Sequence, residues 1–202
     1  MAMKNALPQT VITLSLPPWL ERALPTPDTV FPAVENRMRL VIRLAGQNIA
    51  AGTGGPFGAA VFDGGTGRLI AAGVNLVTSL NSSIAHAEII AIMLAQQQAG
   101  TYDLGGGGLP PLELVTSAEP CAMCLGAIPW SGVRRLVCGA SGEDVAGVGF
   151  DEGAKPAGWQ RELEMRGITV KRNVCRSEAV AVLRRYAEQG GIIYNSRQGG
   201  GQ

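Results

Sequence analysis

Apolar residues return every three to four positions in several segments of the chain, which is the period of an amphipathic helix. The clearest case spans residues 32–51, where Val34, Met38 and Val41 would share one face and Gly52 ends the pattern. Further helices are predicted over residues 84–99, 121–131, 156–166 and 178–189, with Ser83 as the N-cap of the first and Ser177 as the N-cap of the last.

Five shorter apolar runs predict β-strands. Residues 58–62 and 68–75 flank a glycine-rich turn and should form a β-hairpin. Three further runs, at residues 112–116, 133–139 and 168–172, alternate with the helices. This alternation predicts an α/β fold, a three-layer α/β/α sandwich around a five-stranded mixed sheet. We expect the first two strands to pair antiparallel and the last three to run parallel, with a glycine-rich, acidic loop at residues 141–153.

The length of 202 residues suits one domain. Five prolines before residue 28 fix the backbone and remove donors, so residues 1–31 are predicted to form an irregular N-terminal extension. Trp19 and Leu20 are expected to pack at its surface; the alternative is that they pin the segment to the core. Residues 32–198 are predicted to form the single domain, and residues 199–202 a flexible tail.

Composition argues against several classes of protein. The formal net charge of +1 lacks the basic excess of proteins that grip a phosphate backbone, so no nucleic-acid partner is expected. No apolar segment approaches the ~18 residues that a membrane span requires, and no membrane partner is expected. The four cysteines lack the spacing of a small secreted disulfide scaffold, which predicts a reducing, cytoplasmic location.

Two short motifs carry the predicted chemistry. They are His86-Ala87-Glu88 and Pro120-Cys121-Ala122-Met123-Cys124, each at a predicted helix start. Imidazole nitrogen and thiolate sulfur bind Zn²⁺ in tetrahedral geometry, and three protein ligands leave one position for water, whose pKa falls to about 7. The two motifs in this order are the signature of zinc-dependent deaminases. We therefore predict one zinc ion per chain, held by His86, Cys121 and Cys124.

The predicted local structure suits this chemistry. Cys121 and Cys124 lie one turn apart at a helix N-terminus, which favours thiolates, and His86 is expected in the first turn of its own helix. Parallel strands would bring both helix starts to one edge of the sheet. Glu88, which is followed by an apolar run at residues 89–94, is the predicted proton shuttle, with a pKa raised by burial.

Two alternative interpretations explain fewer residues. A structural zinc-binding module needs a fourth Cys or His, yet the chain has one histidine in total, and Cys138 and Cys175 lie in strand-like segments. A redox Cys-x-x-Cys motif leaves the His-x-Glu motif unexplained. Cys138 and Cys175 are predicted to be core thiols without a catalytic role.

The residues around the second motif resemble a known superfamily. The stretch at residues 119–128 is similar both to bacterial tRNA adenosine deaminases and to the short bacterial guanine deaminases. The resemblance to the cytidine and nucleoside deaminase superfamily covers residues 32–195. It implies that the predicted sandwich is of the cytidine deaminase-like type.

Three segments resemble the zinc-dependent guanine deaminases in particular. They are Ile-Pro-Trp at residues 128–130, the loop at 142–152 that contains Gly-Phe-Asp, and Gly-Val-Asn at 73–75. The resemblance implies hydrolytic deamination of guanine to xanthine with release of ammonia. The alternatives are a tRNA adenosine or nucleoside deaminase, and a deaminase of another amino-heterocycle such as a triazine or a pterin.

The resemblance also implies roles for residues around a free purine base. Asn75 would hydrogen-bond the purine, Phe57 would stack on it, and backbone amides near Ala87 would contact the ring. Phe150 and Trp130 would complete the apolar walls.

Asp151 and Glu152 form an acidic pair in the loop at residues 142–152. Guanine presents N–H and NH₂ donors on one edge, and a carboxylate accepts from both, whereas the edge of adenine leaves it mismatched. We expect one of the pair to read this edge and to help move a proton to the leaving ammonia. The alternative is a pair of solvated loop acids, which is the usual state of such residues.

The same resemblance implies a homodimer in which C-terminal segments are exchanged. The segment would be residues 186–197, with Tyr194 available to shield the pocket. Closure of this kind expels water and strengthens electrostatic contacts in the site.

Overall fold

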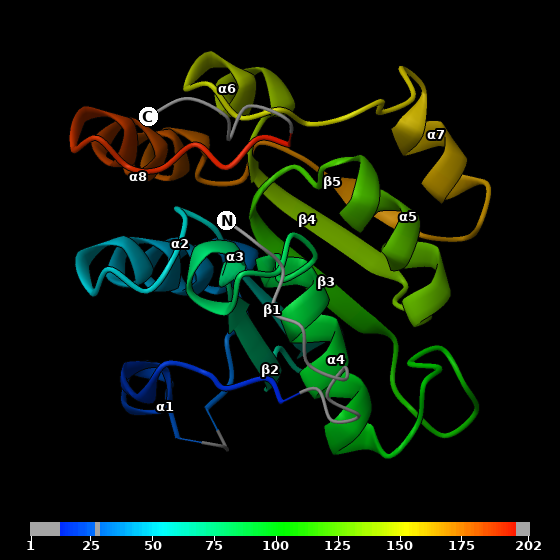
Figure 1. The fold of residues 1–202 in the computed structure, drawn as a ribbon. Coiled ribbons are helices and arrows are strands. Elements are labelled where there is room, and N and C mark those ends of the chain that lie inside the picture. Colours follow the sequence, from blue (N-terminus) through cyan, green and yellow to red (C-terminus); the bar gives the residue numbers. More distant parts are fainter. Residues whose placement is uncertain (1–12, 27–28, 197–202) are drawn as a thin grey trace, which may run out of the picture.

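One mixed sheet of five strands organises the chain, of which the structure, a computed structural model, describes residues 13–26 and 29–196 (Figure 1). The strands are β1 (Gly58–Asp63), β2 (Leu69–Val74), β3 (Leu112–Ala118), β4 (Arg135–Ala140) and β5 (Thr169–Lys171). They lie in the order β2-β1-β3-β4-β5. β1 pairs antiparallel with β2 and β3, whereas β3, β4 and β5 run parallel. The predicted hairpin and the predicted parallel group are therefore confirmed.

Five helices cover the two faces of the sheet: α2 (Val34–Ala50), α4 (Ala87–Ala99), α5 (Ala122–Ser131), α7 (Trp159–Glu164) and α8 (Arg176–Glu188). Successive side chains of a strand point to opposite faces. Phe62 of β1 accordingly packs in the core with α2 and α8, and its neighbour Val61 packs with α4, α5 and α7. Figure 1 shows α2 and α8 on the side of the sheet away from α4 and α5, which confirms the predicted three-layer sandwich.

Three short helices were absent from the prediction: α1 (Pro18–Ala23), α3 (Val77–Leu80) and α6 (Gly142–Gly147). α1 is a helix of 6 residues inside the segment predicted to be irregular, and it can form there because a proline is tolerated at the first position of a helix. Leu20 of α1 is only 1% exposed and belongs to the core, not to the surface.

α6 forms inside the loop predicted at residues 141–153. Ser141 and Asp144 make a capping box, in which Ser141 Oγ accepts from the Asp144 amide at 3.2 Å and Asp144 Oδ2 accepts from the Ser141 amide at 2.8 Å. Arg176, at the start of α8, donates two hydrogen bonds to the Asp144 carboxylate at 2.7 and 2.8 Å. Polar contacts fix this helix, so the period of apolar residues does not reveal it.

Two predicted N-caps are wrong. α4 begins at Ala87 with His86 as its N-cap, not Ser83, and the N-cap of α8 is Cys175, not Ser177. His86 therefore lies just before the first turn, with an extended backbone, and its side chain makes no capping hydrogen bond. The imidazole is left available for other contacts.

The carboxyl ends of three strands lie at one edge of the sheet, because β2 and β3 both run antiparallel to β1 and β4 runs parallel to β3. Asn75 directly follows β2, and Cys121 follows β3 by three residues. Phe57 immediately precedes β1 at the same edge, where its carbonyl accepts from the Asn75 amide at 3.0 Å. Open α/β sheets bind ligands at this kind of edge.

The predicted flexible tail at residues 199–202 lies outside the described residues. The division of the chain into an extension and one domain stays a prediction. No helix in residues 13–26 or 29–196 combines the length and the apolar character that crossing a membrane requires.

Replacing Asp144 with Ala should destabilise the protein, because the change removes both the capping partner of Ser141 and the acceptor for Arg176. A lost helix cap costs about 1 kcal/mol in the free energy of unfolding. Hydrogen bonds from Arg176 hold the pKa of Asp144 well below its usual range. The ionised carboxylate therefore stabilises the folded protein above about pH 4, and this contribution is lost as the pH falls further.

Urea unfolding of the wild type and of Asp144→Ala measures this difference, which should narrow below about pH 4. Glu143→Ala is the matched control, since Glu143 is exposed in the same helix. Equal losses for the two variants, or a difference that does not depend on pH, would contradict the assignment.

Candidate active site

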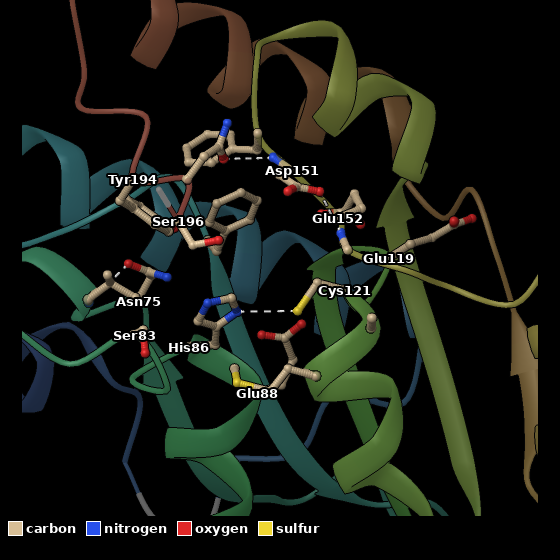
Figure 2. A pocket seen from close by; sticks show the side chains of 17 residues that line it. Asn75, Ser83, His86, Glu88, Glu119, Cys121, Asp151, Glu152, Tyr194 and Ser196 are labelled. Carbon is tan, nitrogen blue, oxygen red and sulfur yellow. Dashed lines mark hydrogen bonds between the residues drawn. The ribbon is translucent and has the colours of Figure 1, made fainter. Parts of the chain in front are cut away.

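Three side chains converge at the starts of α4 and α5, and Figure 2 shows two of them, His86 and Cys121. His86 Nδ1 lies 3.6 Å from Cys121 Sγ and 3.6 Å from Cys124 Sγ. Within the described part of the chain, these residues form the one group of His, Cys, Asp or Glu whose donor atoms all lie within 4.8 Å of one another. One nitrogen and two sulfurs at such separations fit a Zn²⁺ ion, which binds these atoms at about 2.0–2.3 Å.

The backbone alone brings these three donors together. His86 and Cys121 are the N-caps of their helices, and Cys124 lies in the first turn of α5. Gly73 lets α4 lie close to β2, because a Cβ there would come within 2.6 Å of the Ala87 carbonyl oxygen. A hydrogen bond from the Cys124 thiol, assisted by His86, lowers the pKa of Cys121 to about 4, although burial opposes the shift. The site thus favours a thiolate, the form that binds metal.

The two remaining cysteines lie outside this group. Cys138 is buried in β4, and Cys175 is half-buried at the start of α8. A closed structural site would need a fourth such ligand, and none of the described His or Cys side chains supplies it. The arrangement is therefore that of an open site with three protein donors.

Glu88 lies beside the three donors in the first turn of α4. The residue is 6% exposed, and Figure 2 shows its carboxylate on the side of His86 and Cys121. Burial raises the pKa of Glu88 above its ordinary value, as predicted. A carboxyl group whose pKa moves toward neutrality can both take up and deliver a proton.

A cavity of about 320 Å³ opens beside these residues and has an aromatic wall. Phe150 is the centre of that wall: its ring centroid lies 5.1 Å from Phe57 and 5.1 Å from Tyr194, and 6.1 Å from Tyr186, on which it stacks. Phe57, Phe150 and Tyr194 all border the cavity. Such a wall suits a flat heterocycle, because aromatic rings stack or meet edge to face at these distances.

Asn75 presents a hydrogen-bond donor to the cavity. Its Oδ1 accepts from the amides of Gly55 and Val77, each at 3.3 Å. Asn48 braces this turn by donating to the carbonyls of Asn75 at 2.8 Å and Gly55 at 2.9 Å. Asn75 Nδ2 is buried and has no hydrogen-bond partner among the described residues. A buried donor of this kind is costly unless a ligand satisfies it.

The structure separates the two members of the acidic pair, both of which border the cavity. Asp151 is exposed, and its Oδ1 accepts from the Gly153 amide at 2.8 Å. Glu152 is turned inward, where burial raises its pKa to about 7 despite the nearby Lys155. Glu152 is thus the member of the pair in a position to accept from a bound molecule.

The segment at residues 190–196, here called the C-terminal strap, covers one side of the cavity. Asn195 fastens the strap, since its side chain accepts from the Asp151 amide and donates to the Gly149 carbonyl, each at 2.8 Å. Tyr194 lies over the cavity of its own chain, 6.4 Å from the His86 ring. Its hydroxyl is buried without a hydrogen-bond partner in the described residues.

Two residues with predicted roles do not border the cavity. Trp130 lies at the far end of α5 and is 87% exposed, so the structure does not bring it to the pocket. Ala87 is buried at the start of α4 and does not line the cavity. The sequence interpretation in turn missed several residues that do line it: Val77, Ser83, Glu119, Met123, Asn195 and Ser196. Glu119 and Met123 adjoin or lie within the cysteine motif, which was the available signal.

Comparison with known families and proteins agrees with this geometry. Residues 33–140 match the family described as the cytidine and deoxycytidylate deaminase zinc-binding region. The guanine deaminase of Bacillus subtilis is 41% identical over 118 residues, which cover 58% of this chain and 71% of the relative. A tRNA-specific adenosine deaminase of Buchnera aphidicola is 34% identical over 116 residues, which cover 57% of this chain and 70% of the relative.

Solved structures match nearly the whole chain. A guanine deaminase from Nitrosomonas europaea has a TM-score of 0.86 and 50% sequence identity, with 91% of this chain and 100% of that chain covered. A related structure in complex with 2,6-diaminopurine has a TM-score of 0.84 and 52% identity, with 92% and 97% covered. A mutant in complex with 8-azaguanine has a TM-score of 0.85 and 51% identity, with 89% and 98% covered. The expected cytidine deaminase-like fold is therefore confirmed.

The three donors should hold one metal ion per chain. Cys124→Ser replaces one thiolate by a weak ligand, and the metal content after dialysis should fall by at least about tenfold. Inductively coupled plasma mass spectrometry measures the metal bound per chain. Cys175→Ser is the control and should keep the wild-type metal content. A Cys124→Ser protein with a full complement of metal would contradict the assignment.

Proposed function

Since the chain belongs to the zinc-dependent cytidine and deoxycytidylate deaminase family, we propose that it hydrolyses guanine to xanthine and ammonia. The observation that carries this proposal is the pocket itself, where the unpartnered Asn75 amide, the inward Glu152 carboxylate and Glu88 surround a space of about 320 Å³. The similarity over 91% of the chain to a guanine deaminase supports the same substrate.

We propose that His86, Cys121 and Cys124 hold one Zn²⁺ ion. The donor set of one imidazole and two thiolates supports zinc over the hard cations that prefer oxygen. When bound, the metal would lower the pKa of a water molecule and so supply a nucleophile near neutral pH.

The chain's own residues would hold guanine flat and oriented. The ring packs against Phe57 and Phe150, while Asn75 Nδ2 donates to the purine oxygen or a ring nitrogen. Glu152 accepts from the N–H and NH₂ donors of the same edge, which an adenine edge does not offer in this pattern. Orientation of this kind brings C2, the carbon that bears the amine, toward Glu88.

Glu88 would carry the protons of the reaction. Its carboxylate accepts one proton from the water that attacks C2 and delivers it to the ring nitrogen. It then takes the second proton, from the hydroxyl formed at C2, and delivers it to the departing amine. The balance is one guanine and one water consumed, and one xanthine and one ammonia formed. Glu152 assists at the leaving amine, and Tyr194 with the C-terminal strap excludes further water.

The charge of the pocket favours a free base over a nucleic acid. The described lining includes Glu88, Glu119, Asp151 and Glu152 but no Lys or Arg. A tRNA substrate would need basic residues to neutralise phosphates near the site. Other flat amino-heterocycles with the same donor pattern, such as triazines and pterins, belong in the assay panel as alternatives.

Assembly and location stay predictions. We infer a homodimer, and the exposed Trp130 supports a surface that a partner could cover. Exchange of residues 186–197 between protomers stays a prediction, since Tyr194 here lies over its own chain's cavity and Arg197 lies outside the described residues. The cytoplasmic location expected from the sequence also stays a prediction.

Assays of ammonia release test the proposed substrate. Purified protein should release ammonia from guanine and form xanthine in equal amount, with guanine the best of a panel of free bases, nucleosides, triazines and pterins. Activity restricted to an adenosine in tRNA, with an affinity that falls steeply with salt, would contradict the proposal and favour the tRNA deaminases.

The role of Glu88 is tested by Glu88→Gln, which keeps the shape of the side chain but can neither take up nor release a proton at neutral pH. The kcat for guanine should fall by about 10²–10⁴-fold, the range for loss of a general acid–base group. Glu164→Gln, at an exposed position in α7, should leave kcat unchanged. A Glu88→Gln protein with wild-type kcat would show that another group carries the proton.

A further inference from the structure

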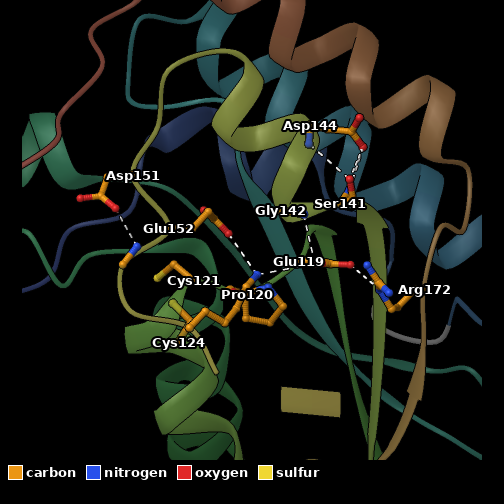
Figure 3. Close-up of polar contacts among 12 residues, drawn as sticks. Glu119, Pro120, Cys121, Cys124, Ser141, Gly142, Asp144, Asp151, Glu152 and Arg172 are labelled. Carbon is orange, nitrogen blue, oxygen red and sulfur yellow. Dashed lines mark hydrogen bonds and ion pairs between the residues drawn. The ribbon is translucent and has the colours of Figure 1, made fainter. Parts of the chain in front are cut away.

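Four charged side chains form a chain of contacts behind the pocket: Arg172, Glu119, Lys155 and Glu152. Arg172 Nε donates to Glu119 Oε1. Lys155 Nζ lies 3.5 Å from Glu119 Oε2 and 3.4 Å from Glu152 Oε2. Figure 3 shows Glu119 at the end of its strand, hydrogen-bonded to Arg172 on one side and to the Gly142 amide on the other.

Lys155 lies at the centre of this chain. An ammonium group has three N–H donors, and Lys155 Nζ meets three acceptors: the two carboxylates and the Pro120 carbonyl at 3.1 Å. The side chain is only 13% exposed, and its Nζ lies 5.5 Å from the centroid of the buried Trp159 ring. These contacts leave the ammonium group little freedom to move.

Two cavities meet at the carboxylates that Lys155 joins. Glu119 and Glu152 border both the substrate pocket and a second cavity of about 530 Å³. Among the described residues, Lys155 borders the second cavity but not the pocket. Lys155 therefore approaches Glu152 from the side away from the substrate and does not touch the bound base.

The Glu152 backbone is anchored, since its carbonyl accepts from the Ala122 amide at 2.9 Å, but the position of its carboxylate depends on Lys155. Lys155 is the one side chain in the described residues that hydrogen-bonds to its carboxylate. Glu152 lies in a loop without regular secondary structure. The next residue, Gly153, has a φ of +70°, and Ala154 is exposed. Without the ammonium group, the carboxylates of Glu119 and Glu152 would repel each other in a partly buried space. Glu152 would then turn away from the pocket wall.

We propose that Lys155 is a positioning residue that holds the Glu152 carboxylate at the pocket wall, in the orientation that reads the amino edge of the substrate. Hydrogen bonds from Arg172 and from the Gly142 amide fix the Glu119 carboxylate, which in turn holds Lys155 in place. This inference rests on the proposed function for the role of Glu152, and it assigns to Lys155 a contribution that passes through Glu152 alone.

A double-mutant cycle tests the proposal. Guanine kcat and KM are measured for wild type, Lys155→Met, Glu152→Gln and the double variant, with Lys171→Met, at an exposed position in β5, as the matched control. Lys155→Met should lower kcat/KM by about tenfold or more, since an error of ~1 Å in a reacting group has effects of this order. In the Glu152→Gln background the same change should cost less than about twofold, because Glu152→Gln has already removed the ion pair that Lys155 makes with this residue.

Lys155→Arg is the conservative rescue. The second cavity has room for the longer side chain, and a guanidinium can bridge the two carboxylates, so kcat/KM should return to within about threefold of wild type. Zinc content and thermal unfolding of each variant show whether the metal site and the fold are intact. Equal losses from Lys155→Met in both backgrounds would assign Lys155 a structural role, and no loss in the wild-type background would leave it without any role. Either result overturns the proposal.

A crystal structure of Lys155→Met gives a readout that does not depend on turnover. The Glu152 carboxylate should move from the pocket wall by more than about 1 Å, whereas an unmoved carboxylate overturns the proposal. If the wild type releases no ammonia from guanine, the proposed function fails, and this displacement alone decides the role of Lys155.

Discussion

The approach of two helix N-termini at one edge of the sheet is the constraint on which the rest of the site depends. His86 and Cys121 are N-cap residues with extended backbones, so their side chains project from the starts of α4 and α5. Gly73 permits the close contact between α4 and β2 that brings the imidazole to the sulfurs. A shift of one residue at either helix start would turn a donor away, and a shift at the start of α4 would also move Glu88.

Burial of negative charge is the second constraint, and it explains the groups that surround the pocket. Glu88, Glu152 and the Cys121 thiolate share a space from which water is partly excluded, where like charges repel strongly. A bound divalent cation would offset this charge on one side, and Lys155 with Arg172 offsets it on the other. Cations on both sides would therefore stabilise the negative charge around the pocket.

The parts of the molecule that local rules govern could be predicted from sequence. The strand and helix periods indicated the three-layer sandwich and its strand directions, and two short motifs indicated the three donors and Glu88. α6 was missed because polar capping by Ser141 and Asp144, not a period of apolar residues, stabilises it. α1 was missed because the prolines around it indicated an irregular segment, although Leu20 is buried. Trp130 was expected at the pocket by resemblance alone, yet its helix ends far from the cavity. The contact between Lys155 and Glu119 joins positions 36 residues apart in sequence, so no local sequence pattern could predict it.

X-ray absorption spectroscopy of the purified protein at the zinc edge tests the central claim most directly. We expect a four-coordinate zinc with two sulfur ligands, one imidazole nitrogen and one oxygen from solvent, at distances of about 2.3, 2.0 and 2.0 Å. A zinc surrounded by four protein ligands would contradict the open site, and so would a protein that binds no zinc under conditions in which it is folded.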